Sequence, residues 1–223
     1  MCGRYALYGP RSRTKAETEY FSNLERLPSS WNVAPTHMQP ITRFHDGTIK
    51  QTTARWGLIP RWAKDEKIGF KSINARAETL ATSPAFRGAY KMRHRCLVPA
   101  SGFFEWETRP DGKQPYYFTS AEGSLLAFAG LWDTWRRPDG AEVLSFTIIT
   151  TAPNDFVKRF HDRMPVILDE RDYARWLDGS EDAKDLLKAC HNEALINYPV
   201  GRQVNSVRNN DPSLVLPLEA PAP

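Results

Sequence analysis

The sequence has few cysteines and no long hydrophobic run. Only Cys2, Cys96 and Cys190 occur among its 223 residues. An odd number of cysteines without a CxxC pair argues against a disulfide framework, so a reducing cytoplasm is the expected location. The longest nearly apolar stretch, residues 125–132, is far shorter than the roughly 20 residues that span a bilayer. No apolar segment near the start indicates a secretory signal, and we expect no association with a membrane.

Zinc-ligand spacing is also missing. The five histidines, at positions 37, 45, 94, 161 and 191, show no zinc-ligand spacing with the cysteines. Cys190 and His191 are adjacent, which suits no common structural zinc site. The sequence therefore indicates neither a metal site nor a bound cofactor.

What the sequence does have is an ordinary globular composition with an uneven distribution of charge. Hydrophobic residues make up 41% and charged residues 25%, which argues against disorder and, at this length, for one domain. Residues 1–100 contain 17 Lys and Arg against 7 Asp and Glu, whereas residues 101–223 contain 13 against 19. A basic half suggests an anionic partner such as nucleic acid, unless the charges of the two halves mix on the folded surface.

Strand signals outnumber helix signals. β-branched and aromatic residues predict strands at residues 51–56, 95–98, 102–106, 115–119, 125–131 and 143–150. Asp-Gly pairs, which favour hairpin turns, occur at residues 46–47, 111–112 and 139–140. Short helices are expected at residues 15–24, 84–90, 170–177 and 180–190, and another opens at residues 151–154 and runs to about 159.

These elements predict an α+β fold. The expected architecture is a single domain, residues 1–216, in which mainly antiparallel, twisted β-sheets form a barrel-like core with short helices around it. A Rossmann-type fold is disfavoured because strands and helices do not alternate. Residues 217–223 are rich in proline and are expected to form a loose tail.

Cys2 is the most informative residue for chemistry. A small residue at position 2 normally allows removal of Met1, which would leave the α-amine and thiol of Cys2 on adjacent carbons. Both groups have ordinary pKa values near neutrality. Such a 1,2-aminothiol condenses with an aldehyde to a five-membered thiazolidine ring. The alternative is a small buried cysteine behind a retained Met1.

Three further residues are candidates for the same chemistry. Asn74 offers both a donor and an acceptor, and on a strand it would face the same way as Arg76, whose guanidinium suits phosphate. Glu105 lies among aromatic residues, where desolvation would raise its pKa towards neutrality. His161 is the best proton-transfer candidate among the histidines. The alternatives are a helix cap for Asn74, a solvated Arg76 and Glu105, and a structural role for His161.

Several motifs occur in order along the chain. They are residues 1–5 (MCGRY), 31–35 (WNVAP), 54–60 (ARWGLIP), 74–79 (NARAET), 96–106 (CLVPASGFFEW), 161–165 (HDRMP), 198–200 (YPV) and 204–205 (VN). Together they resemble the SRAP (SOS response-associated peptidase) family over all but the Pro-rich end. Ser101 stands where that family often has Asp, next to the motif rather than within its catalytic positions.

The resemblance implies a DNA-repair function. Family members bind single-stranded DNA, especially near junctions with duplex, and shield abasic sites, so we expect a monomer that is cytoplasmic and associates with the nucleoid when bound to DNA. The mature Cys2 would form a thiazolidine with the abasic aldehyde, giving a covalent DNA–protein crosslink. Asn74 would position Cys2 or the opened sugar, and Glu105 would shuttle protons and assist reversal of the crosslink. His161 would act on the sugar hydroxyl and the neighbouring phosphate.

The expected DNA surface combines cations with stacking groups. The resemblance implies that Arg4 and Arg76 grip the phosphates that flank the lesion. The candidates for base stacking or for a wedge against a duplex end are Pro40, Trp62, Phe70 and Trp106. Thr150 is a candidate phosphate donor. Core packing explains the stacking candidates equally well, and helix capping explains the threonine.

Two rival functions stay open. A cysteine peptidase would use Cys2, His161 and Glu105 as nucleophile, base and orienting group, and its first cleavage would be the removal of Met1. A plain single-stranded-DNA binder would bind intact and abasic strands equally, with strong salt dependence. Lyase activity is a side reaction of the favoured chemistry, because an imine on the Cys2 amine permits β-elimination.

Overall fold

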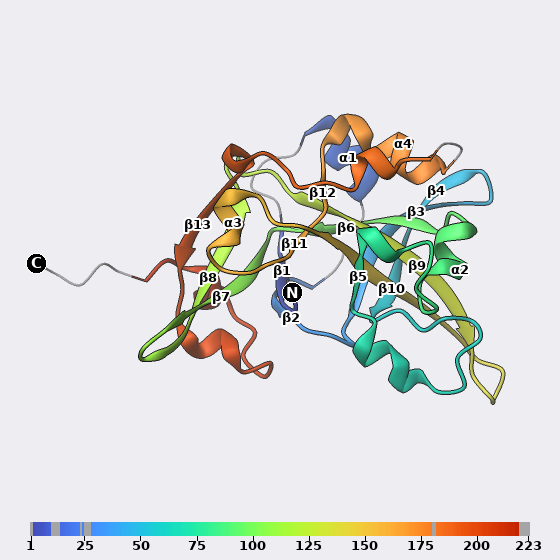
Figure 1. Ribbon diagram of the computed structural model, residues 1–223, viewed down its shortest axis with the longest axis horizontal. Coiled ribbons are helices and arrows are strands. Elements are labelled where there is room, and N and C mark those ends of the chain that lie inside the picture. The colour runs from blue at the N-terminus through green and yellow to red at the C-terminus, as the bar shows by residue number, and fades with distance from the viewer. Residues whose placement is uncertain (1, 10–13, 23, 25–27, 180–181, 219–223) are drawn as a thin grey trace, which may run out of the picture.

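The computed structural model describes residues 2–9, 14–22, 24, 28–179 and 182–218 (Figure 1). The strands are β1 Tyr5–Leu7, β2 Ser30–Val33, β3 Met38–His45, β4 Thr48–Trp56, β5 Asn74–Arg76, β6 Arg95–Ala100, β7 Gly102–Arg109, β8 Gly112–Ser120, β9 Leu126–Arg136, β10 Glu142–Thr151, β11 Met164–Pro165, β12 Ile167–Leu168 and β13 Leu195–Pro199. The α-helices are α1 Lys15–Phe21, α2 Arg87–Lys91, α3 Asp155–Lys158 and α4 Tyr173–Asp178. None of the helices in these ranges is both long and apolar enough to cross a bilayer.

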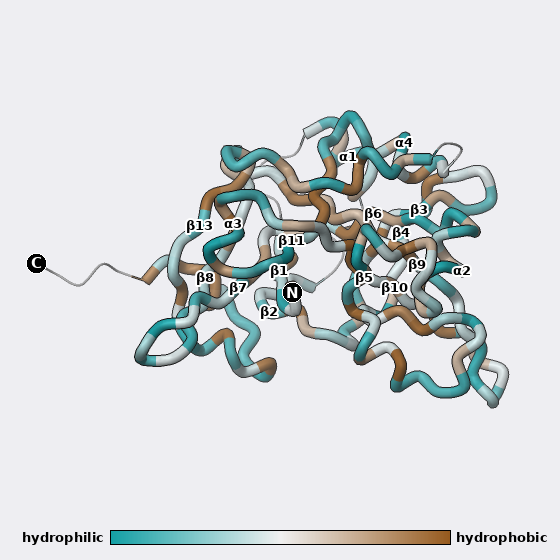
Figure 2. The backbone as a smooth tube through the Cα atoms, in the orientation of Figure 1, coloured by the Kyte–Doolittle hydropathy of each residue, from teal (hydrophilic) through white to brown (hydrophobic). Residues whose placement is uncertain are grey.

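Five strands close into a barrel. Hydrogen bonding runs from β10 through β4, β3, β6 and β9, and β9 pairs with β10 again. Every pair in this ring is antiparallel except β10 with β4, which is parallel. Trp56, Phe128 and Phe146 are fully buried in the main hydrophobic core. Figure 2 shows the hydrophobic segments concentrated on the barrel strands and the hydrophilic segments in the outer loops.

A second sheet lies beside the barrel. Its strand order is β13-β8-β7-β1-β2, and all its pairs are antiparallel. The chain passes from β6 of the barrel to β7 of this sheet through Ser101 alone. Only glycine fits at position 102, the first residue of β7, because a Cβ there would lie 2.4 Å from the Phe118 carbonyl oxygen. Figure 1 shows the start of β1 near the middle of the molecule, where this sheet adjoins the barrel.

The fold class expected from the sequence is confirmed, and the local hairpin signals are accurate. The Asp-Gly pairs at 46–47, 111–112 and 139–140 connect β3 to β4, β7 to β8 and β9 to β10. Thr14 caps α1 through a capping box with Glu17, and Gly179 ends α4 in the left-handed conformation. These features depend on residues close in sequence, which is why the sequence predicts them.

Some expected helices are wrong or misplaced. Within residues 182–190 the only helical turn is the 3₁₀ helix Lys184–Leu186 rather than an α-helix, because tertiary packing outweighs helix propensity there. The second helix begins at Arg87 rather than at residue 84, with Phe86 at its cap, and α1 ends at Phe21 rather than at residue 24. Ser180, Met1 and residues 219–223 of the expected tail lie outside the described residues.

Candidate active site

Cys2 is separated from Tyr5, the first residue of β1, by Gly3 and Arg4, and it is fully buried. Its thiol donates a weak hydrogen bond to the Arg4 carbonyl oxygen at 3.8 Å. Burial raises the pKa of the Cys2 thiol well above its usual range, and the nearby charge of Glu105 raises it further. In this state the sulfur is a protonated thiol and a poor nucleophile, so chemistry at Cys2 requires a change in its surroundings.

Asn74 holds the backbone of Cys2. It begins β5, which pairs in parallel with β10 and buries the Asn74 side chain to 9% exposure. Its Nδ2 donates to the Cys2 carbonyl oxygen at 2.9 Å. Its Oδ1 is buried and has no hydrogen-bond partner among the described residues. The helix-cap alternative fails, because Arg76 rather than Asn74 occupies the cap of the following 3₁₀ helix, Ala77–Thr79.

Glu105 is a buried carboxyl whose pKa lies close to neutral pH. It lies on β7 with 2% of its surface exposed, so the alternative of a water-facing side chain is wrong. Burial raises its pKa to about 7. Both the acid and the carboxylate are therefore populated at neutral pH, which suits a group that transfers protons in either direction.

His161 follows α3 and is partly buried. Burial lowers the pKa of its imidazole, so the neutral form dominates at pH 7. Nδ1 accepts a hydrogen bond from the backbone N–H of Arg163 at 3.0 Å and also lies 2.7 Å from Asp162 Oδ1. The first contact needs a lone pair on Nδ1 and the second favours a proton there. The two neighbours thus favour opposite proton positions on the imidazole, which suits proton transfer at Nε2.

An open pocket of about 350 Å³ connects the proton-transfer groups. Its lining consists of Glu105, Trp106, Lys113, His161 and Asn205. The indole Nε1 of Trp106 donates to Asn205 Oδ1 at 2.8 Å, which fixes the plane of the ring. Across the described parts of the chain, no three His, Cys, Asp or Glu side chains gather as they would around a metal ion.

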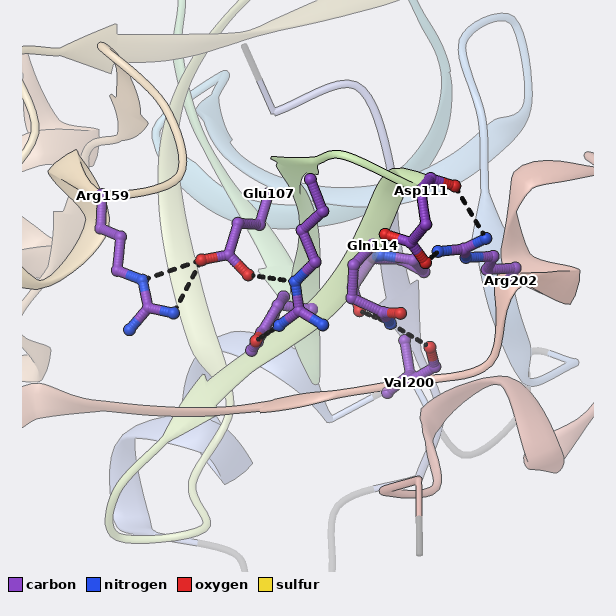
Figure 3. Close-up of polar contacts among 9 residues, drawn as sticks. Glu107, Asp111, Gln114, Arg159, Val200 and Arg202 are labelled. Atoms are coloured by element: carbon purple, nitrogen blue, oxygen red, sulfur yellow. Dashed lines mark hydrogen bonds and ion pairs between the residues drawn. The ribbon is translucent and has the colours of Figure 1, made fainter. Parts of the chain in front are cut away.

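Ion pairs hold the elements that surround this pocket (Figure 3). Glu107 Oε1 accepts from Arg159 beside α3 at 2.7 Å, and Glu107 Oε2 accepts from Arg109 at 2.7 Å. Asp111 in the β7–β8 turn pairs with Arg202, which begins the 3₁₀ helix that carries Asn205. The β7–β8 hairpin is thereby tied to both other walls of the pocket.

Arg163 has a structural role that the sequence did not indicate. Its guanidinium forms a two-bond ion pair with Glu78, at 2.7 and 2.9 Å, and donates to the Thr150 carbonyl oxygen at 2.6 Å. Arg163 thus joins the segment after Asn74 to the loop of His161. Both partners lie within the motifs at residues 74–79 and 161–165, but nothing in either motif indicates that they pair.

Besides Trp106 in the pocket lining, the expected DNA-binding residues fall into three groups. Arg76, Trp62 and Phe70 are exposed, the two aromatic side chains by 56% and 60%. Arg4 is half-buried and donates to Asn32 Oδ1 at 2.7 Å and to the Val204 carbonyl oxygen at 2.8 Å.

The third group is buried. Pro40 lies in β3 opposite Thr53, away from the residues that line the Glu105 pocket. Thr150 is fully buried in β10, and its hydroxyl lies 3.5 Å from the Ala75 carbonyl oxygen as a hydrogen-bond donor. The structure therefore brings together Cys2, Asn74 and the pocket lining, whereas Thr150 is fully buried and Pro40 lines a different pocket.

The family model described as "SOS response associated peptidase (SRAP)" matches residues 1–207. "Abasic site processing protein YoqW" of Bacillus subtilis is 41% identical over 226 residues, covering 96% of this chain and 99% of that protein. "Abasic site processing protein HMCES" of Gallus gallus is 36% identical over 270 residues, covering 100% of this chain and 80% of that protein.

The fold comparison agrees with the sequence comparisons. A crystal structure of a Bacteroides thetaiotaomicron protein matches with a TM-score of 0.85 at 28% identity, covering 98% of this chain and 100% of that chain. The family model covers residues 1–207, which include the strands of both sheets and the motifs that supply the site, and the chain therefore belongs to the SRAP family.

Proposed function

We propose that this protein recognises abasic sites in single-stranded DNA and shields them through a covalent thiazolidine crosslink to Cys2, formed after removal of Met1. Relatives named as abasic site processing proteins support the substrate. The observation that carries the chemistry is the hydrogen bond from Asn74 to Cys2 beside the buried Glu105. An N-terminal aminothiol held next to a proton-transfer group suits condensation with the aldehyde of an opened abasic sugar.

The reaction has two bond-forming steps. The α-amine of Cys2 attacks C1′ of the aldehyde, and the carbinolamine loses water to give an imine. The thiolate then adds to the imine carbon, and the nitrogen takes up the proton that the thiol has lost. Glu105, with a pKa of about 7, is suited to protonate the departing hydroxyl and to accept the thiol proton. One water leaves overall, and the reverse sequence opens the crosslink.

The other candidates have supporting roles. Neutral His161 transfers a proton at the sugar hydroxyl, and Arg4 and Arg76 bind the flanking phosphates. Exposed Trp62 and Phe70 offer stacking faces for single-stranded bases or for the end of a duplex. Pro40 and Thr150 are buried, and we include neither in the DNA surface.

Two accompanying activities use the same groups. Self-removal of Met1 would need a nucleophile, a base and an orienting group, which Cys2, His161 and Glu105 can supply. Lyase activity would follow from β-elimination at the imine before the thiol closes the ring. The family name supports the peptidase alternative.

A denaturing gel with an abasic single-stranded oligonucleotide tests the proposal. Wild-type protein should give a heat-stable adduct, and Cys2→Ala and Cys2→Ser should give none. Both variants keep the α-amine of residue 2 and lack the thiol, so each should yield at most an imine that borohydride traps. Turnover of casein together with no adduct in the wild type would favour a peptidase, and equal, purely non-covalent affinity for intact and abasic strands would favour a simple DNA binder.

A further inference from the structure

Lys113 occupies a place in the pocket that the proposed chemistry does not use. It lies on β8 directly after the Asp111-Gly112 turn and is exposed. Its side chain lines the same pocket as Glu105 and His161. A lysine at the mouth of a site for an anionic strand offers a compact, flexible point charge.

The neighbouring charges on the hairpin are already paired. Glu107 forms an ion pair with Arg109, and Figure 3 shows its contact with Arg159 and the contact of Asp111 with Arg202. By contrast, Lys113 makes neither a hydrogen bond nor an ion pair with any side chain in the described ranges. The carboxylates Glu107 and Asp111 of the hairpin are thus engaged in ion pairs, and the Lys113 ammonium is available to an external anion.

The positive charge of Lys113 lowers the pKa of both proton-transfer groups, Glu105 and His161. Burial lowers the pKa of His161, and the positive charge of Lys113 contributes to lowering it further. Burial raises the pKa of Glu105, and the charge of Lys113 offsets part of that rise. An anion bound by Lys113 would therefore lie within electrostatic range of the reacting groups.

We infer that Lys113 binds a backbone phosphate of the DNA strand at this pocket and thereby sets where the strand lies against Glu105 and His161. The inference rests on the proposed function, because it takes single-stranded DNA as the occupant. Trp106, held by Asn205, forms the adjoining wall and provides a stacking face beside that phosphate. Lys113 is thus a substrate-binding residue on the opposite strand of the hairpin from Glu105.

Equilibrium binding of an intact, fluorescently labelled single-stranded oligonucleotide, measured against NaCl concentration, tests this role without any covalent step. Wild type, Lys113→Gln and Lys113→Arg are compared. The matched control is Lys50→Gln, which removes the same charge from a lysine already paired with Asp46 at 2.7 Å on the β3–β4 hairpin. Thermal melting of each variant confirms folding.

Loss of one phosphate contact predicts a specific change. The negative slope of log K against log salt should become shallower by about 0.7 in Lys113→Gln, while Lys113→Arg and Lys50→Gln keep the wild-type slope. Crosslinking of an abasic strand at subsaturating protein should slow several-fold in Lys113→Gln alone. Wild-type slope and crosslinking rate in Lys113→Gln would overturn the inference and leave the proposed function intact. Absence of crosslinking in the wild type would instead reject the covalent function, and the salt slope on the intact strand would still test Lys113.

Discussion

The side-chain amide of Asn74 donates from Nδ2 to the carbonyl oxygen of Cys2 at 2.9 Å, while its Oδ1 stays buried without a hydrogen-bond partner in the described ranges. One amide therefore fixes the backbone of the reacting residue and still offers an acceptor. We expect the α-amine of the processed Cys2 to be the partner of that acceptor. This contact joins β5 of the barrel assembly to the start of β1 in the second sheet.

Replacement of Asn74 should slow crosslinking without unfolding the protein. Asn74→Ala leaves the Cys2 carbonyl without this donor, a loss of roughly 1–3 kcal/mol in the positioning of Cys2, so the crosslinking rate should fall by about five-fold to a hundred-fold. Arg76→Gln is the matched control, since it should weaken DNA binding but keep the rate at saturating DNA. The measurement is single-turnover crosslinking followed on denaturing gels. A wild-type rate in Asn74→Ala would contradict the role of the contact.

Glu105 should make stability depend on pH in a defined direction. Its folded-state pKa of about 7 lies above the unfolded value of about 4.3, so the folded protein favours the protonated form. Glu105 contributes its full share of the free energy of unfolding below about pH 4. That contribution decreases as the pH rises, and it is lost once the pH exceeds about 7.

The variant Glu105→Gln removes this dependence. It should be more stable than wild type at pH 8, by up to about 3 kcal/mol, and similar to it near pH 4.5. Urea unfolding at the two pH values measures the difference. The same variant should lose crosslinking activity, and a stability difference that is equal at both pH values would contradict the buried, neutral carboxyl.

His161 should contribute to crosslinking by transferring a proton. Asp162 should contribute less directly, by favouring a proton on Nδ1 of His161. His161→Ala should slow crosslinking by about 10²-fold or more, in the range of general acid–base catalysis. Asp162→Asn should have a smaller effect, because this carboxylate is 82% exposed and its charge is screened. The pH–rate profile of Asp162→Asn should shift its histidine limb to lower pH, since the wild-type Asp162 charge raises the pKa of His161 against the larger effect of burial. An unchanged profile would exclude this role for Asp162.

Arg163 should matter more for stability than its partner Glu78. Arg163→Met leaves the Thr150 carbonyl and the Glu78 carboxylate without their donor and should cost about 3 kcal/mol. Glu78→Gln should cost less than about 1 kcal/mol, because the Glu78 side chain is 52% exposed. Urea unfolding at pH 7 distinguishes the two variants. Equal losses would mean that the ion pair itself, rather than the buried arginine, stabilises the loop.

The sequence predicts the local parts of this fold and not the long-range ones. Asp-Gly turns and the start of α1 at Lys15 depend on neighbouring residues, and the structure has them. Barrel closure depends on the parallel pairing of β4 with β10, which joins Arg55 to Ser145 and has no local signal. Strands of two or three residues, such as β1, β5 and β11, exist only because partner strands lie beside them.

The candidate site shows the same division. Motifs identify Cys2 and Glu105 as chemically suitable residues, but the contact of Asn74 with Cys2 spans 72 positions and follows only from the fold. The Arg163–Glu78 pair spans 85 positions and was not predicted. The burial of Thr150 also follows only from the fold, since its hydroxyl suits phosphate in sequence and lies fully buried in β10.

The most direct test of the account is intact mass spectrometry of the protein after incubation with a single-stranded oligonucleotide that carries one abasic site. The account predicts a heat-stable adduct whose mass equals the protein without Met1 plus the oligonucleotide, less one water, and its absence in Cys2→Ala. A protein confirmed to begin at Cys2 that forms no such adduct, or a Cys2→Ala variant that forms it as stably as wild type, would contradict the thiazolidine mechanism.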